Sequence, residues 1–137
     1  MKNKKRIEKM STRTQIRLIE NGKHYDLYHH CDGYFEGVGK QLKDALANVG
    51  KKGAKAVIRF LKETSDLFED TNALHGDIEY FYLLDFDRDK YEGIAVDFLP
   101  WPKGTDFNSL YISPLPAEHY EKMDLVTGLV TITYMVE

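Results

Sequence analysis

The dipeptide Asn21-Gly22 constrains the fold of this chain more than any other feature of its sequence. Both residue types tolerate positive φ, which a type I′ turn requires at its two central positions, so the pair predicts a two-residue β-hairpin loop. The expected hairpin covers residues 12–30. Its register places Arg17 opposite Asp26 and separates a largely apolar face from a polar one, as a half-buried sheet requires.

The hydrophobic pattern after the hairpin changes from a helical period to a strand period. The expected elements are helices over 38–49 and 54–68 and strands over 78–86, 91–99 and 128–136. A short helix is expected near 117–123, after an irregular stretch over 100–116 that prolines punctuate. The order β-β-α-α-β-β-β predicts an α+β fold, with a mainly antiparallel sheet and two helices packed on one face.

Composition limits the chain to a few broad classes of protein. Its 137 residues, 42% of them hydrophobic, suit one domain with one core and argue against disorder of the whole chain. We expect a flexible basic leader over 1–10 and a single domain over 11–137. Cys31 is the only cysteine, so no internal disulfide can form. Because no apolar stretch is long enough for a membrane span, we expect a cytoplasmic protein with no membrane partner.

Charge divides unevenly along the chain. Residues 1–62 hold 15 lysines and arginines against 6 acidic residues, whereas residues 63–137 hold 4 against 16. Such a division is typical of a basic patch for nucleic acid, of an acidic face that imitates nucleic acid, or of two halves that attract each other in one domain. An acidic mimic needs the carboxylates of residues 66–97 on one open face. No recognised nucleic-acid motif accompanies the basic residues.

One short segment after the hairpin groups side chains that can do chemistry. Its candidate catalytic residues are His30, Asp32 and Tyr34. A histidine near a carboxylate can act as a tuned acid/base pair, and a phenol can position a substrate. The alternative is structural, with Asp32 accepting loop amides and Gly33 taking a left-handed turn. The sequence has no spaced Cys/His cluster, so we expect no dedicated metal site and no cofactor.

The loop His30–Gly39 is also a candidate ligand-binding site. A glycine-rich loop that enters a helix presents N–H groups and the positive end of the helix dipole to an anion. The loop is not a Walker A motif, because Gln41 stands where Ser or Thr would hold magnesium. The ligand-binding candidates are Tyr28, His30, Asp32, Gly33, Tyr34, Gly37, Gly39 and Lys40.

Three stretches of sequence carry a resemblance to a protein family. They are Met10-Ser11-Thr12-Arg13, Tyr28-His29-His30-Cys31-Asp32-Gly33-Tyr34 and Gly37-Val38-Gly39. The chain resembles small proteins of bacteria and their phages that begin with Met-Ser-Thr-Arg and carry Tyr-x-His-x-Asp-Gly-Tyr before a helix. The resemblance covers about the first 40 residues well and the strand Ile78–Phe86 more loosely. It implies a phage or mobile-element origin, and it names no activity.

These observations leave three functions open. The first is a non-enzymatic binding or accessory protein of phage or mobile-element type, such as an anti-defence protein, that engages a protein or a small anionic ligand through His30–Gly39. The second is a small hydrolase or nuclease, metal-assisted or not, with His30 as general base and Asp32 as orienter or metal ligand. The third is an acidic inhibitor that mimics nucleic acid. Aromatic strands also leave an edge-pairing homodimer open.

Overall fold

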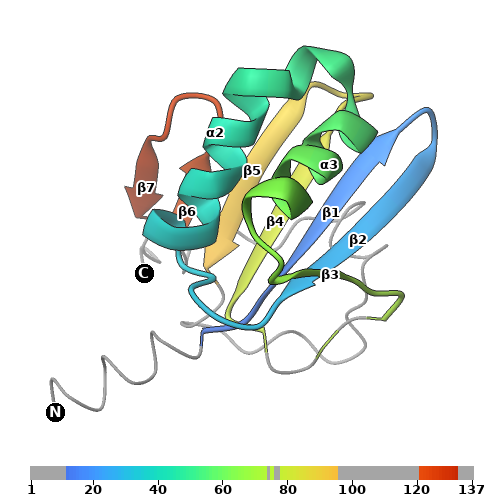
Figure 1. Cartoon of the computed structure of the whole chain (residues 1–137). Coiled ribbons are helices and arrows are strands. Elements are labelled where there is room, and N and C mark those ends of the chain that lie inside the picture. Colours follow the sequence, from blue (N-terminus) through green and yellow to red (C-terminus); the bar gives the residue numbers. More distant parts are fainter. Residues whose placement is uncertain (1–11, 74, 76–77, 96–120, 133–137) are drawn as a thin grey trace, which may run out of the picture.

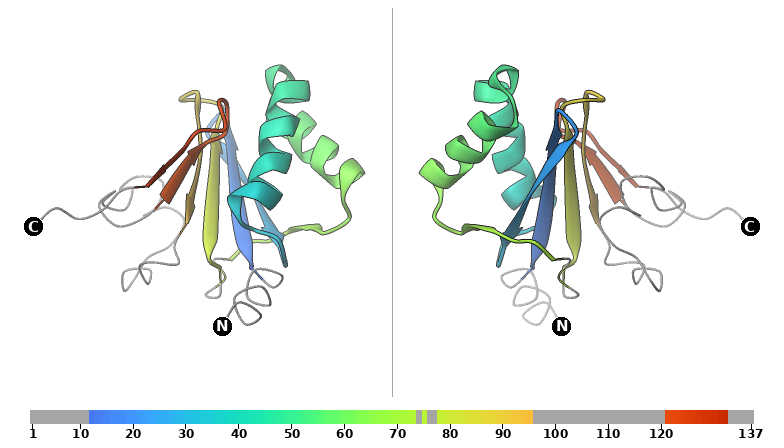
Figure 2. Two further views of the ribbon diagram at one scale, coloured as in Figure 1. Left: turned by 90° about the vertical axis from the view of Figure 1, so that its left-hand side faces the viewer. Right: turned by 90° about the vertical axis from the view of Figure 1, so that its right-hand side faces the viewer.

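The computed structural model describes residues 12–73, 75, 78–95 and 121–132. These residues form a seven-stranded sheet with helices on one of its faces (Figure 1, Figure 2). The strands are β1 (Thr14–Glu20), β2 (Lys23–His29), β3 (Phe68–Asp70), β4 (Tyr80–Asp85), β5 (Lys90–Ala95), β6 (Glu121–Asp124) and β7 (Val130–Ile132). The helical elements are η1 (Phe35–Gly39), α2 (Lys40–Val49), η2 (Gly50–Lys52) and α3 (Ala54–Thr64). The fold is therefore α+β, as predicted.

The predicted hairpin of β1 and β2 is confirmed in its turn and in its register. Asn21 and Gly22 have φ values of 55° and 74°, and Arg17 lies opposite Asp26. Asp87, in the turn between β4 and β5, accepts hydrogen bonds from the Asn21 and Gly22 amides at 2.7 and 2.9 Å. The Gly22 and Asn21 amides hold the pKa of Asp87 below its usual range. The tips of two hairpins are thus joined through one carboxylate.

The strand order is β3-β2-β1-β4-β5-β6-β7, and only β1 and β4 pair in parallel among these strands. After β2 the chain covers one face of the sheet with its helices, returns beside β2 as β3, and then enters the sheet interior as β4 (Figure 1). The sheet is therefore mainly antiparallel, as predicted. β4 is apolar on both faces and almost wholly buried, as a strand in the interior of a covered sheet must be.

The hydrophobic core lies between the helices and the sheet. Alternate residues of each central strand meet the apolar stripes of α2 and α3, which is the arrangement that periods of 2.0 and 3.6 residues produce. The fully buried apolar members are Ile16, Leu18, Leu27, Val38, Leu42, Ala45, Ala54, Val57, Leu61, Tyr82, Leu84 and Leu125. Packing in this core fixes the position of the loop that connects β2 to the helices.

Tyr82 connects this core to the loop that follows the hairpin. Its ring lies over Gly93, its cross-strand partner on β5, where any Cβ would overlap the ring. Its hydroxyl donates a hydrogen bond to the Gly33 carbonyl at 2.6 Å. Burial raises the pKa of Tyr82 well above its ordinary value, so the hydroxyl stays protonated and remains a donor.

The second predicted helix ends four residues earlier than expected. It stops at Thr64, whose hydroxyl donates to the Leu61 carbonyl at 3.0 Å, and the Ser65 hydroxyl accepts the Leu67 amide at 3.2 Å. Such side-chain bonds to the backbone compete with continued helix. Phe68, which continues the apolar stripe of this helix in sequence, instead begins β3 and enters the core from the sheet.

The helix predicted near 117–123 is wrong for the described residues, because Glu121–Asp124 form strand β6. Met123 and Leu125, two residues apart, both enter the core, which is the period of a strand. The chain reverses direction between the two helices at a glycine. Gly50 keeps a right-handed conformation, and Gly53 makes the reversal with φ of 96°.

Several predictions fall outside the described residues. They concern the leader over 1–10, the ends of two strands over 96–99 and 133–136, and the stretch over 100–116. Among the described residues, no helix is long and apolar enough to cross a membrane.

Candidate functional site

The predicted site segment forms a loop between β2 and α2 whose backbone is bonded to itself. The Val38 amide donates to the Asp32 carbonyl at 2.8 Å. The Gly37 and Gly39 amides both donate to the Tyr34 carbonyl, at 2.9 and 3.3 Å. Backbone groups that pair within a loop fix its shape. The loop backbone therefore has a defined conformation, which is called the loop frame below.

Two positions in this loop have room only for glycine. A Cβ at Gly37 would overlap the Asp32 carbonyl oxygen, and a Cβ at Gly33 would lie 2.8 Å from Thr14 Cβ. The Gly33 amide also donates to the Thr12 carbonyl at 3.0 Å. Asp32 has φ of 54°, a left-handed conformation that Asp tolerates better than most residues. The glycines thus serve the close packing of the loop on itself and on the start of β1.

The loop enters α2 through the π-helical turn η1 instead of a capped α-helical start. The amides of Gly37, Val38 and Gly39 donate to carbonyls within the loop, and the Lys40 amide donates to the Gly37 carbonyl. These four N–H groups are already engaged, so they do not form the anion cradle that an α-helix start offers. An anion at this place would meet side chains, including the exposed Lys40.

Asp32 and Tyr34 meet on the outer side of the loop. The Tyr34 hydroxyl donates to Asp32 Oδ1 at 3.3 Å, and both residues are partly exposed. Burial, and then the Asp32 carboxylate, raise the pKa of Tyr34, so the phenol stays protonated at neutral pH. A carboxylate has several acceptor sites, which leaves Asp32 able to accept a further donor from a partner.

His30 stands apart from this pair. Its exposed ring lies beside Tyr28, with 6.5 Å between the ring centroids. Tyr28 in turn stacks on His75 at 4.0 Å, so it is engaged by the loop that follows β3. Among the described residues, no polar contact joins His30 to Asp32. The structure thus brings together Asp32 and Tyr34, whereas the imidazole of His30 lies beside Tyr28.

The buried histidine of this segment is His29, which the sequence did not single out as a site residue. It is 1% exposed and lies edge-on to Phe68, and its Nδ1 bonds to the Cys31 carbonyl. Burial lowers the pKa of His29, although the Cys31 carbonyl and the Asp32 carboxylate act in the opposite direction. Its Nε2 is buried and has no partner in the described part of the chain. The hairpin register, which puts His29 on the face of Leu27, was the available signal.

Cys31 is a poor candidate for a nucleophile. Burial, followed by the neighbouring Asp32 carboxylate, raises the pKa of its thiol. The thiolate is the reactive form of cysteine, and both effects disfavour it.

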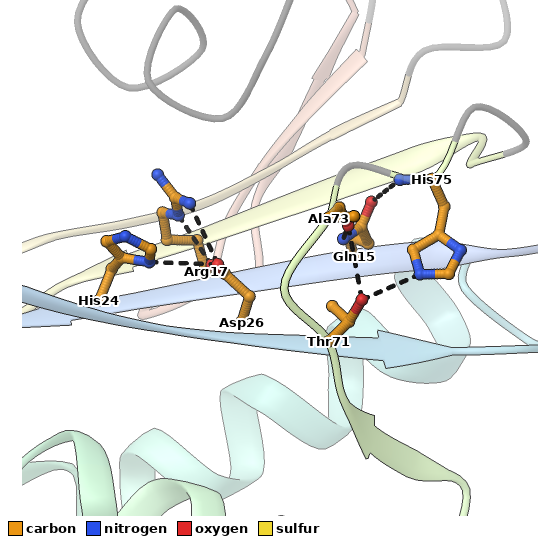
Figure 3. Close-up of polar contacts among 7 residues, drawn as sticks. All are labelled: Gln15, Arg17, His24, Asp26, Thr71, Ala73 and His75. Atoms are coloured by element: carbon orange, nitrogen blue, oxygen red, sulfur yellow. Dashed lines mark hydrogen bonds and ion pairs between the residues drawn. The ribbon is translucent and has the colours of Figure 1, made fainter.

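The hairpin face that points away from the helices carries a buried ion pair (Figure 3). Arg17 makes two bonds to Asp26, from Nε to Oδ1 at 2.7 Å and from its terminal nitrogen to Oδ2 at 3.1 Å. Both side chains are 5% exposed, and His24 Nδ1 lies 3.1 Å from Asp26 Oδ2. The predicted pair of Arg17 and Asp26 is therefore present but buried, and Arg17 is not available to touch phosphates.

Gln15 extends this polar cluster by clamping the loop that follows β3 (Figure 3). Its amide nitrogen donates to the Ala73 carbonyl at 2.7 Å, and its oxygen accepts the His75 amide at 2.6 Å. The Thr71 hydroxyl lies 3.0 Å from His75 Nε2. Gln15 is fully buried with both ends of its amide bonded, as a buried polar group requires. The cluster thus holds the loop after β3 against the sheet and is not an open site.

The described carboxylates do not gather on one open face. Asp66 and Glu69 lie at the β3 edge of the sheet, whereas Asp87 and Asp89 lie in the turn between β4 and β5. Asp85 is fully buried. These described carboxylates therefore lie at separate places in the fold.

Six exposed basic residues of the first half lie on the helical elements. They are Lys40, Lys51, Lys52, Lys55, Arg59 and Lys62. Of these six, only Lys62 forms an ion pair with another described residue, Asp70, at 2.8 Å. The helical elements therefore expose basic side chains that are not neutralised by described acidic residues.

Within the ranges that the structure describes, no three His, Cys, Asp or Glu side chains are arranged to hold a metal ion. Comparisons with protein-family models, with curated proteins and with solved structures found no match for this chain.

Proposed function

We propose that this chain is a cytoplasmic binding or accessory protein of phage or mobile-element type. It recognises a protein or a small anionic ligand through the loop His30–Gly39. One observation carries this proposal: the loop backbone is locked by its own hydrogen bonds, while the side chains of His30, Tyr34 and Lys40 remain accessible at its surface.

A locked frame favours binding for an energetic reason. Association costs free energy to order loops and side chains, and a loop that is already ordered avoids much of that cost. The groups that the frame presents also suit recognition. Tyrosine is enriched among residues that dominate binding energy, and the pair of Asp32 and Tyr34 offers both an acceptor and an aromatic surface.

The hydrolase alternative has less geometric support. A general base must lie within hydrogen-bond reach of its partners, and the described contacts place His30 beside Tyr28 while Asp32 bonds to Tyr34. Binding needs only that these groups be presented together on one surface. We therefore favour recognition over turnover.

The experiment compares the full-length chain with two variants in retention of partners from a bacterial lysate. His30→Ala/Tyr34→Ala removes the exposed ring of His30 and the partly exposed ring of Tyr34, and Lys55→Ala is the matched control on α3. We expect the loop variant to lose specifically retained proteins by at least about tenfold, since hot-spot aromatic residues contribute more than 1.4 kcal/mol each. Unfolding temperatures should agree among the three proteins.

Two further measurements complete this experiment. Inorganic phosphate is titrated into ¹⁵N-labelled protein, because a small-anion ligand would shift the amides of residues 30–40 in the wild type and not in Lys40→Ala. Hydrolysis of bis(p-nitrophenyl) phosphate is measured with and without Mn²⁺. A folded His30→Ala/Tyr34→Ala protein that binds partners and phosphate as the wild type does would refute the proposal. So would turnover that His30→Ala abolishes.

A further inference from the structure

Large apolar side chains are exposed at two places in the described part of the chain. Three of them, Val126, Leu129 and Val130, lie in and beside the turn between β6 and β7 and are 62%, 66% and 41% exposed. The fourth, Leu67, is 44% exposed just before β3. Because β3 and β7 end the order of described strands, these places lie at opposite edges of the sheet (Figure 1). Exposed apolar patches of this kind often mark interaction surfaces.

The patch at the β7 edge borders a groove. A cavity of about 490 Å³ lies between the C-terminal half of α2 and the turn between β6 and β7. Its apolar lining includes Leu46, Tyr91 and Val126, and two lysines, Lys43 and Lys51, also line it. This volume is within the range of cavities that hold ligands or anchoring side chains.

The charges of this groove are unbalanced. Lys43 and Lys51 form no ion pair with another described residue. Asp89 is the one acidic residue among the described residues that line the cavity. Burial, and then its neighbour Asp89, raise the pKa of Tyr91 to about 12, so Tyr91 adds a neutral donor and no negative charge. The groove is therefore an apolar surface with spare positive charge.

The turn that forms one wall of the groove is held in a fixed shape. Asp124 Oδ1 accepts the amides of Val126 and Thr127 at 2.8 and 3.3 Å. The Lys43 side chain lies against Gly128, where a Cβ would come 2.9 Å from Lys43 Cε. The exposed apolar side chains are thus presented by an ordered turn, which lowers the entropic cost of binding.

The opposite edge has the complementary character. Leu67 is flanked by Asp66 and Glu69, which are exposed and form no ion pair with another described residue. Asp70 is also exposed, although Lys62 neutralises it. The β3 edge therefore presents one apolar side chain between unpaired negative charges. Its charge is opposite to that of the groove.

We propose that the groove beside the turn between β6 and β7 receives the Asp66–Asp70 segment of a second copy of this chain. Leu67 enters the apolar lining, and Asp66 and Glu69 meet Lys43 and Lys51. The two surfaces differ, so the contact is heterologous and joins copies head to tail. It does not depend on the His30–Gly39 loop.

A second copy fits the groove better than a nucleic acid does. Bases stack on exposed aromatic rings, and the exposed side chains here are aliphatic. The required combination of a leucine and two carboxylates is also present on this chain. The test therefore uses the full-length protein itself as the probe.

Sedimentation velocity is measured from about 10 μM to about 1 mM protein, a range that spans weak association. We expect the mean mass to rise continuously with concentration and to fall when about 0.5 M salt screens the charges. Lys43→Glu/Lys51→Glu and Asp66→Lys/Glu69→Lys should each weaken association by at least about tenfold. Lys52→Glu/Lys55→Glu makes the same change of charge away from the groove and should leave association unchanged. Circular dichroism establishes that each variant is folded.

The quadruple variant that reverses both surfaces at once supplies the decisive comparison. It should regain association, because each reversed surface again meets its complement. A wild type that stays monomeric throughout would overturn the proposal, and so would a wild type that stops at a dimer. A quadruple variant that stays as weak as its parents, or a control variant that associates as poorly as they do, would overturn it as well. Association retained by folded His30→Ala/Tyr34→Ala separates this result from any failure of the loop.

Discussion

His29 shows how burial of one ionisable residue makes stability depend on pH. Because its folded pKa is lowered, the neutral imidazole is favoured in the folded state. Its contribution is fully present above the unfolded pKa of about 6.5 and is lost as pH falls from there through the lower folded value. We therefore predict that the free energy of unfolding of the wild type falls more steeply between about pH 7 and pH 5 than that of His29→Gln.

Urea denaturation at a series of pH values checks this prediction. His30→Gln is the matched control, because it removes the neighbouring exposed imidazole. The control should follow the wild type in its dependence on pH. Identical slopes for the wild type and His29→Gln would show that the buried ring does not govern acid sensitivity.

For single residues, the sequence predicted which residues lie opposite one another in the hairpin better than it predicted which of them are buried. The hairpin register predicted that Arg17 lies opposite Asp26, and this pairing is correct. The sequence could not show that the polar face is buried, because part of its cover comes from the distant loop that Gln15 clamps. Local pairing follows from a turn, whereas burial depends on contacts between residues far apart in the chain.

At the scale of elements, the loop depends on glycine for space as well as for conformation. We predict that Gly37→Ala lowers the free energy of unfolding by about 3 kcal/mol, because the new Cβ overlaps a backbone oxygen that cannot easily move. Gly22→Ala is the matched control. Its φ is 74° but no atom lies within 4 Å of a Cβ there, so only the left-handed conformation costs energy, about 1 kcal/mol.

Chemical denaturation of both variants measures this difference. A Gly37→Ala protein no less stable than Gly22→Ala would mean that the loop has room to relax, and that its frame is not tightly packed.

Sequence patterns predicted some helices, strands and turns correctly and missed others. Asn21-Gly22 identified its turn because the conformation depends on two residues alone. The end of α3 at Thr64 and the strand β6 were missed, since an apolar residue such as Phe68 fits a helical stripe and a sheet edge equally well. The π-helical start of α2 was also missed, because it arises from bonds between loop carbonyls and helix amides. Tertiary contacts decide these cases.

At the scale of the whole molecule, function is assigned to two separate surfaces. The His30–Gly39 loop precedes the N-terminal end of α2 (Figure 1). The groove lies beside the C-terminal half of the same helix. Tyr82, which is fully buried, anchors the loop to the core through the Gly33 carbonyl, so the proposed recognition surface is attached to the core. The sequence located the loop, whereas the groove joins segments too distant to be linked by any pattern.

Native-state hydrogen exchange tests the central claim, which is that the loop is locked before any partner binds. We predict that the Val38 amide, bonded to the Asp32 carbonyl, exchanges at least about a hundredfold more slowly than an unstructured peptide, with protection close to that of the buried Leu18 amide in β1. Exchange of Val38 within about tenfold of the unstructured rate, while Leu18 stays protected, would contradict it.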